Sequence, residues 1–96
     1  MTVQHMVWCK FKDDIGPERI AEHVAKLKTL PAGIDFVQKI EIGENFTDRA
    51  KGFNVGLIVS LPDRESLPRY LEHPYHVEVA TPLKEDAELM AMDIEV

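Results

Sequence analysis

The chain is arranged around the sequence Arg69-Tyr70-Leu71-Glu72-His73-Pro74-Tyr75-His76, which contains both tyrosines and two of its four histidines. Proline suits the first turn of a helix but breaks its interior, so Pro74 predicts two helical pieces. His73, directly before it, is pushed out of helical geometry and should lie at the N-cap of the second piece. We expect His76 in that helix's first turn, where unpaired N–H groups and the helix dipole disfavour its protonated form.

Two interpretations of this stretch remain open from its residues alone. A histidine that stays neutral near pH 7 can accept a proton, and Tyr70, at the end of the preceding helix, can offer a phenolic O–H beside it. Alternatively, the stretch only fixes a helix–proline–helix corner, and its aromatic rings cover a core.

Length and composition predict a single soluble domain spanning residues 1–96. An apolar fraction of 45% and a charged fraction of 29% are ordinary for a globular protein. The net charge of −6, with no cluster of Lys or Arg, argues against nucleic acid. A single cysteine fits a reducing compartment, and no apolar run is long enough for a membrane span or a signal peptide. We therefore expect a cytoplasmic protein without a membrane partner.

The first predicted strand, Val3–Lys12, is apolar on both of its faces. Met6 and Trp8 point one way, and the other face carries His5, Val7, Cys9 and Phe11. A strand that is apolar on both faces is buried on both, but the helices of so small a protein can cover only one. The face with Met6 and Trp8 is therefore expected to meet a partner chain.

A first helix is predicted from Pro17, with an apolar stripe that ends near Leu30. Gly33 is expected to close this helix as a left-handed residue. His23 lies at the edge of the stripe, which favours a half-buried packing role over catalysis. The remaining strands and helices are predicted over Phe36–Gly43, Phe53–Leu61, Arg64–Glu72, His76–Leu83 and Ala87–Val96.

This order, β-α-β-β-α-(α)-β, is typical of the ferredoxin-like α+β fold, an antiparallel sheet with helices on one face. The helix-free face would expose Met6, Trp8 and part of the last strand, a patch too apolar for a monomer. Two such sheets packed face to face would form a dimeric α+β barrel. We therefore predict a symmetric homodimer.

Four segments carry a resemblance to a known family, and they follow one another in the family's order. They are His5–Lys12, Leu30–Ala32, Gly52-Phe53 and Tyr70–His76. On these segments the chain resembles the stress-responsive A/B barrel (Dabb) family of the dimeric α+β barrel superfamily. The resemblance implies a homodimer with a pocket between sheet and helices for a small, mostly apolar molecule, and no cofactor.

The resemblance also implies site residues. In one plant member, olivetolic acid cyclase, a tyrosine and a histidine that match Tyr70 and His76 catalyse an intramolecular aldol condensation of a polyketide. A pocket histidine on its first strand matches His5. Its other pocket positions match residues of different type in this chain, namely His23, Leu27 and Val55. Val7, Cys9 and His73 complete the expected binding set.

An aldol closure needs a base for the proton next to a carbonyl and a donor for the enolate oxygen. His76 suits the first role and Tyr70 the second. Two alternatives stay open: cofactor-free oxygenation, as in a related branch, and a non-catalytic stress-response dimer with a filled core. A metal held by His73 and His76 would need a third ligand, for which only His5 is a candidate, so we predict no metal site. A cavity beside Tyr70 and His76 would discriminate between a pocket and a filled core.

Overall fold

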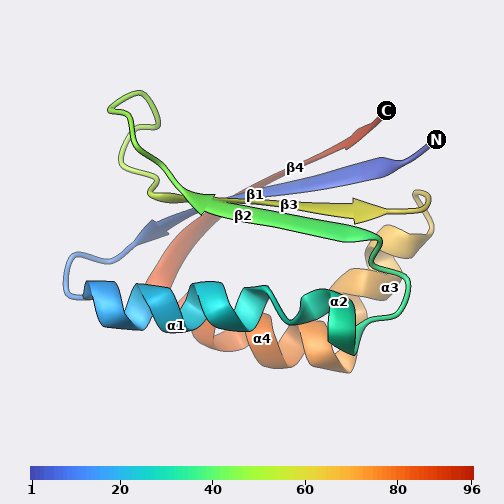
Figure 1. The fold of residues 1–96 in the computed structure, drawn as a ribbon, viewed down its shortest axis with the longest axis horizontal. Helices are drawn as coiled ribbons and strands as arrows, with labels where there is room; N and C mark the ends of the chain where they lie inside the picture. Colours follow the sequence, from blue (N-terminus) through green and yellow to red (C-terminus); the bar gives the residue numbers. More distant parts are fainter.

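The computed structural model describes residues 1–96 and contains four strands and four helices (Figure 1). In chain order they are β1 (Val3–Phe11), α1 (Pro17–Leu27), α2 (Leu30–Gly33), β2 (Lys39–Glu44), β3 (Val55–Leu61), α3 (Ser66–Glu72), α4 (Pro74–Asp86) and β4 (Ala87–Glu95). The strands form one sheet in the order β2-β3-β1-β4, and all neighbouring strands are antiparallel. All four helices lie on one side of this sheet. The predicted ferredoxin-like α+β fold is confirmed.

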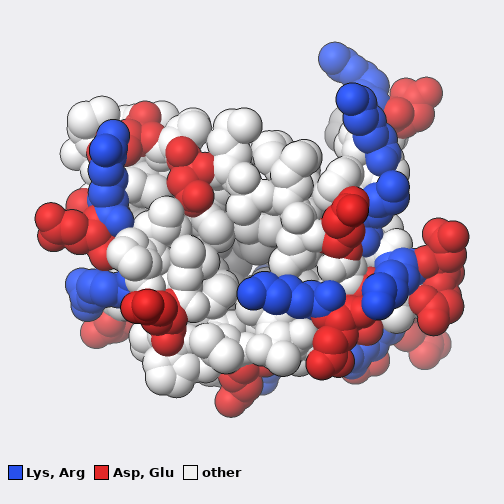
Figure 2. Space-filling model, turned by 180° about the vertical axis from the view of Figure 1, so that it is seen from behind, with Lys and Arg blue, Asp and Glu red and all other residues white.

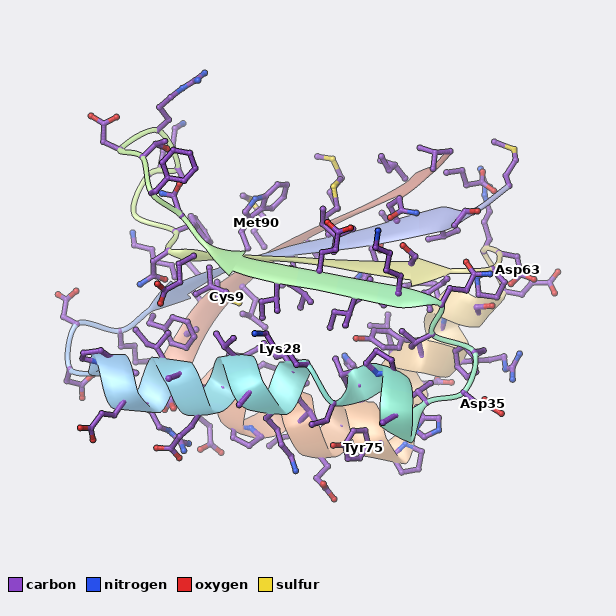
Figure 3. All side chains as sticks on the ribbon, viewed as in Figure 1. Cys9, Lys28, Asp35, Asp63, Tyr75 and Met90 are labelled. Atoms are coloured by element: carbon purple, nitrogen blue, oxygen red, sulfur yellow. The ribbon has the colours of Figure 1, made fainter.

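The central strand β1 divides its side chains between the two faces of the sheet as expected. Its odd-numbered residues from Val3 to Phe11 are buried, while Met6 and Trp8 are only half-buried. Figure 3 shows the same division, with Cys9 on the helix side of the sheet and Met90 on the opposite side. The core therefore lies between the sheet and the helix layer.

The helix-free face of the sheet is apolar and uncovered. In the strand register Trp8 lies between Gly56 of β3 and Met90 of β4, and Met6 lies between Ile58 and Met92. The two methionines of β4 are 49% and 52% exposed. We name this surface, Met6, Trp8, Ile58, Met90 and Met92, the open face.

The corner at Pro74 has the predicted geometry. His73 ends α3 and caps α4, and its backbone (φ −59°, ψ 133°) is not helical. Its ring Nδ1 accepts a hydrogen bond from the backbone N–H of Tyr75, at 3.1 Å. A side-chain acceptor at this position satisfies one of the otherwise unpaired donors of a helix start. His76 therefore lies in the first turn of α4, as expected.

Helix α4 is longer than the sequence pattern predicts, because it continues through Pro82 to Asp86. The hydroxyl of Thr81 donates to the carbonyl of Val77 at 2.7 Å, one turn earlier in the helix. Beyond the proline, Leu83 is buried in the core. Packing of this last turn overrides the tendency of proline to end a helix.

The prediction that Gly33 ends the first helix in a left-handed conformation is wrong. Helix α1 ends at Leu27, Gly33 is the last residue of the separate short helix α2, and only Lys51 and Gly52 have positive φ. Gly33 is instead a contact point, because a Cβ there would lie 2.4 Å from Cδ2 of Tyr75. Glycine thus lets α2 approach the start of α4.

We expect Gly33→Ala to lower the free energy of unfolding by up to about 2 kcal/mol. Alanine favours a helix by roughly 1 kcal/mol, but overpacking costs about 1–3 kcal/mol. The Tyr75 ring cannot move freely, since its hydroxyl lies 2.5 Å from Oγ1 of Thr29. Urea denaturation measures the change. Gly43→Ala is the control, since nothing lies within 4 Å of its Cβ position; equal effects in the two variants would contradict the argument.

Candidate functional site

A cavity of about 220 Å³ lies between the sheet and helices α3 and α4. Most of its lining is apolar, and five of the predicted site residues belong to it: His5, Val7, Leu27, Tyr70 and His76. The volume corresponds to about seven water molecules at roughly 30 Å³ each. The cavity is therefore suited to a small organic molecule rather than a large cofactor.

Tyr70 supplies a hydrogen-bond donor to this cavity. Its ring is almost fully buried, at 1% exposed, and burial raises the pKa of the phenol well above its ordinary value of 10.0. The hydroxyl of Tyr70 has no hydrogen-bond partner within the protein. Every fully buried side-chain N or O atom of the protein does have one, so this hydroxyl is not fully buried. The hydroxyl must therefore reach the free space of the cavity, protonated and available.

His76 supplies a proton acceptor beside Tyr70, with ring centroids 4.5 Å apart. Its Nδ1 lies 3.0 Å from the carbonyl oxygen of Leu71. A carbonyl only accepts, so Nδ1 carries the hydrogen, and the neutral ring keeps a lone pair on Nε2. Burial lowers the pKa of His76, the bond to Leu71 opposes this, and the neighbouring basic groups lower it further. Burial is the largest of these causes, and it favours the neutral ring.

His5 also lies beside Tyr70, with its ring edge-on at a centroid distance of 5.6 Å. Its Nδ1 is 2.5 Å from Oδ1 of Asp93, the residue opposite it on β4. A carboxylate bound to Nδ1 fixes the orientation of the imidazole and leaves Nε2 without a partner in the protein. The expectation that His5 faces the helices near His76 is confirmed by this geometry. Asp93, which holds it, was not predicted.

Four of the predicted binding residues lie outside the cavity lining, and three of them are Cys9, Val55 and His73. Cys9 and Val55 face each other across β1 and β3 nearer the other end of the sheet, where packing is complete. Burial raises the pKa of the Cys9 thiol to about 11, which agrees with an inert core cysteine. His73 is occupied as the cap of α4, and its ring stands edge-on to Phe36.

His23 also lies outside the cavity, and it is fully rather than half-buried as predicted. Its Nε2 is 2.6 Å from Oδ2 of Asp86, which also accepts a hydrogen bond from Nε of Arg19 at 2.8 Å. These contacts connect α1 to the end of α4. His23 therefore has a structural contact, between two helices.

We expect the contacts of Asp86 to make the stability of the fold depend on pH in the acidic range. The hydrogen bonds from His23 and Arg19 lower the pKa of Asp86 below its ordinary value of 3.8. A lowered carboxyl pKa contributes stability that is complete above the unfolded pKa and is lost as the pH falls through the folded one. Asp86→Asn should therefore reduce the melting temperature at pH 7, with a difference from wild type that shrinks below about pH 4. Melting curves across pH 2–7 test this, with the exposed, unpaired Asp13→Asn as control; a pH-independent difference for Asp86→Asn would contradict it.

Sequence reasoning missed much of the wall that α4 contributes. Val79, Ala80, Leu83 and Lys84 all line the cavity. Their spacing after His76 is that of one helical face, so the signal was present. Lys84 was missed because the helix was predicted to end at Leu83, and the other three were predicted to be helical but were not assigned to the pocket.

No group of three or more His, Cys, Asp or Glu side chains is placed to share a metal ion. No helix combines the length and apolar character needed to cross a membrane. The polar side chains of the cavity lining are those of Tyr70, His5, His76 and Lys84. A phenol donor beside a neutral imidazole acceptor can move a proton on a bound carbonyl compound.

The fold and the cavity together define a ferredoxin-like α+β domain with a small apolar pocket between sheet and helices. The chain belongs to the stress-responsive A/B barrel domain family, which it matches over residues 3–96. The Arabidopsis thaliana stress-response A/B barrel domain-containing protein HS1 is 27% identical over 81 residues, 82% of this chain and 74% of that protein.

Solved structures with the same fold include proteins of different description. A hydroxynitrile lyase from Passiflora edulis superposes with a TM-score of 0.91 at 16% identity, covering 99% of this chain and 93% of the other. A dimeric ferredoxin-like protein of unknown function from Bacteroides fragilis has a TM-score of 0.80 at 28% identity, covering 99% and 96%. The fold thus occurs both in an enzyme and in proteins without a known activity.

Proposed function

We propose that this protein is a homodimer that binds a small, mostly apolar carbonyl compound in the cavity and acts on it by cofactor-free acid–base chemistry of the aldol cyclase or lyase type. The observation that carries the proposal is the placement of Tyr70 and His76, 4.5 Å apart by ring centroids, on one cavity. A stress-response dimer with a filled core would have no such space.

The chemistry follows from the protonation of the two groups. Nε2 of His76 takes the proton next to a carbonyl, and the hydroxyl of Tyr70 donates a hydrogen bond to the enolate oxygen that forms. The enolate carbon then attacks a second carbonyl, and the alkoxide produced takes a proton from the imidazolium, which restores the neutral ring. General acid–base catalysis of this kind accelerates a step by about 10²–10⁴-fold.

The open face supports the dimer. Its exposed apolar side chains form a patch that a monomer would leave in water. A wider hollow of about 510 Å³ adjoins this face beneath the β2–β3 loop. That hollow contains no histidine or tyrosine, so it is assigned to assembly rather than to chemistry. The similarity to the dimeric Bacteroides fragilis protein agrees with this assignment.

Binding of a neutral ketone tests the pocket. We expect 2-heptanone to shift the NMR signals of Val7, Val79 and Leu83 in the ¹⁵N-labelled protein. Ala91→Phe, which places a ring at the edge of the cavity, should abolish these shifts. Ala25→Phe, on the exposed surface of α1, is the matched control and should leave them unchanged. Shifts that persist in Ala91→Phe would place the binding elsewhere and contradict the proposal.

A further inference from the structure

The charge of the cavity lining differs from that of the whole chain. The chain has 17 acidic residues against 11 Lys and Arg, and its net charge is −6. No Asp or Glu belongs to the lining, whose only charged or titratable groups are Tyr70, His5, His76 and Lys84. Figure 2 shows an uncharged, hollowed centre, with acidic and basic side chains around the periphery and one basic side chain across its lower edge. Lys84 is therefore the only Lys or Arg in a lining that contains no Asp or Glu, and the one nearby carboxylate, Asp93, is paired with His5.

Lys84 lies on the same face of α4 as His76 and Ala80. The three residues are spaced by four, so they stand one above another along the helix. From His76 to Lys84 the helix rises by about 12 Å, at 1.5 Å per residue. The lysine therefore borders the end of the cavity away from the His76 ring, although its side chain leans back toward it. Its charge contributes to the lowered pKa of His76, which agrees with this proximity.

Lys84 also has no acidic partner in the protein. Arg19, Lys26, Lys39 and Arg64 form ion pairs with carboxylates, whereas Lys84 and the remaining Lys and Arg residues form none. None of the ion pairs in the structure includes Lys84. An unpaired ammonium group at the edge of an apolar cavity attracts an anionic group of a ligand.

We infer that the ligand of this cavity carries a carboxylate-type anionic group, which binds Lys84, on an apolar body that extends toward Tyr70 and His76. This inference rests on the proposed binding in the cavity and specifies the chemical class of the ligand. For the proposed reaction the substrate is then an apolar oxo acid. Its carboxylate is held at Lys84, Ala80 and Leu83 contact its carbon chain, and its carbonyl reaches the hydroxyl of Tyr70.

The alternative role for Lys84 is to cover the cavity edge with its carbon chain while its ammonium group stays in water. Lys84→Met separates the two roles, because methionine keeps an unbranched apolar side chain and removes only the charge. Lys12→Met is the matched control, since Lys12 is exposed, forms no ion pair and lies beyond the end of β1, away from the cavity.

Two probes with equal numbers of non-hydrogen atoms, hexanoate and 2-heptanone, test the inference. Dissociation constants are measured by NMR titration at pH 7 and low salt. We expect hexanoate to bind about tenfold more tightly than 2-heptanone, as expected for a hydrogen bond to a charged group. Lys84→Met should remove this preference and leave the ketone affinity unchanged. Lys12→Met should retain the preference.

The outcomes separate this inference from the proposed function. If both probes bind equally and Lys84→Met changes neither, the carboxylate assignment is wrong while the pocket stands. If 2-heptanone binds and hexanoate does not, the assignment is wrong in the same way. If neither probe binds at millimolar concentration, the proposed binding function itself fails, and the ligand class fails with it.

Discussion

Trp8→Glu is expected to convert the protein to a monomer or to make it insoluble. In the proposed dimer Trp8 lies at the centre of the open face, with Gly56 opposite on one side and Met90 on the other. A second sheet packed on this face would bury the introduced carboxylate without a partner, and removing one member of a buried pair already costs about 3–5 kcal/mol. This exceeds what one lost apolar contact would cost, so the dimer should dissociate completely at micromolar concentration.

Light scattering after size-exclusion chromatography measures the mass of each variant. Val77→Glu is the matched control, because Val77 is an exposed apolar residue on α4, on the other side of the molecule from the open face. It should remain a dimer. A stable, well-folded monomer of the unmodified protein would disprove the assembly proposal, whatever the variant does.

The sheet could be predicted from the sequence because its determinants are local. Alternation along Val3–Phe11 and Val55–Leu61 fixes which side chains face the helices, since a shift by one residue would expose the whole core face. The proline at position 74 likewise predicts the corner and the cap by His73. In each case the residues that form the pattern lie within ten positions of the structure that they predict.

The errors arise where contacts between distant residues decide the local structure. Gly33 looks like a left-handed helix end, but the Tyr75 ring, which is distant in sequence, leaves no room for a Cβ at this position. Pro82 looks like a helix stop, but the burial of Leu83 and the pairing of Asp86 with His23 hold the last turn. No local pattern contains these partners.

The candidate site follows the same rule. Tyr70, His76 and His5 could be proposed from their types and their predicted elements. To predict Asp93, one would need the register of β4 against β1, which places it opposite His5. To predict Lys84, one would need the full length of α4. Asp93, which orients His5, and Lys84, which adds a positive charge, were therefore less predictable than Tyr70, His76 and His5.

Tyr70→Phe and His76→Ala are each expected to lower turnover of an intramolecular aldol substrate, such as 2,6-heptanedione, by about 10²–10⁴-fold. Stability should change little for Tyr70→Phe, because its hydroxyl bonds to no protein group. Because the pKa of His76 is lowered from 6.5, the imidazole remains neutral somewhat below pH 6.5. Activity should therefore persist there and be lost as the pH falls through the pKa of His76 in the folded protein. Initial rates across pH 4–8 measure this.

Tyr75→Phe is the matched control for the catalytic pair. Its hydroxyl contacts Thr29 outside the cavity, so removing it should cost about 1 kcal/mol of stability and leave turnover intact. If the pair at Tyr70 and His76 only fixes the corner, its two variants should behave in the same way as Tyr75→Phe. A loss of about 1–3 kcal/mol in both, with no substrate found among polyketides and aldehydes, would therefore support the structural alternative over catalysis.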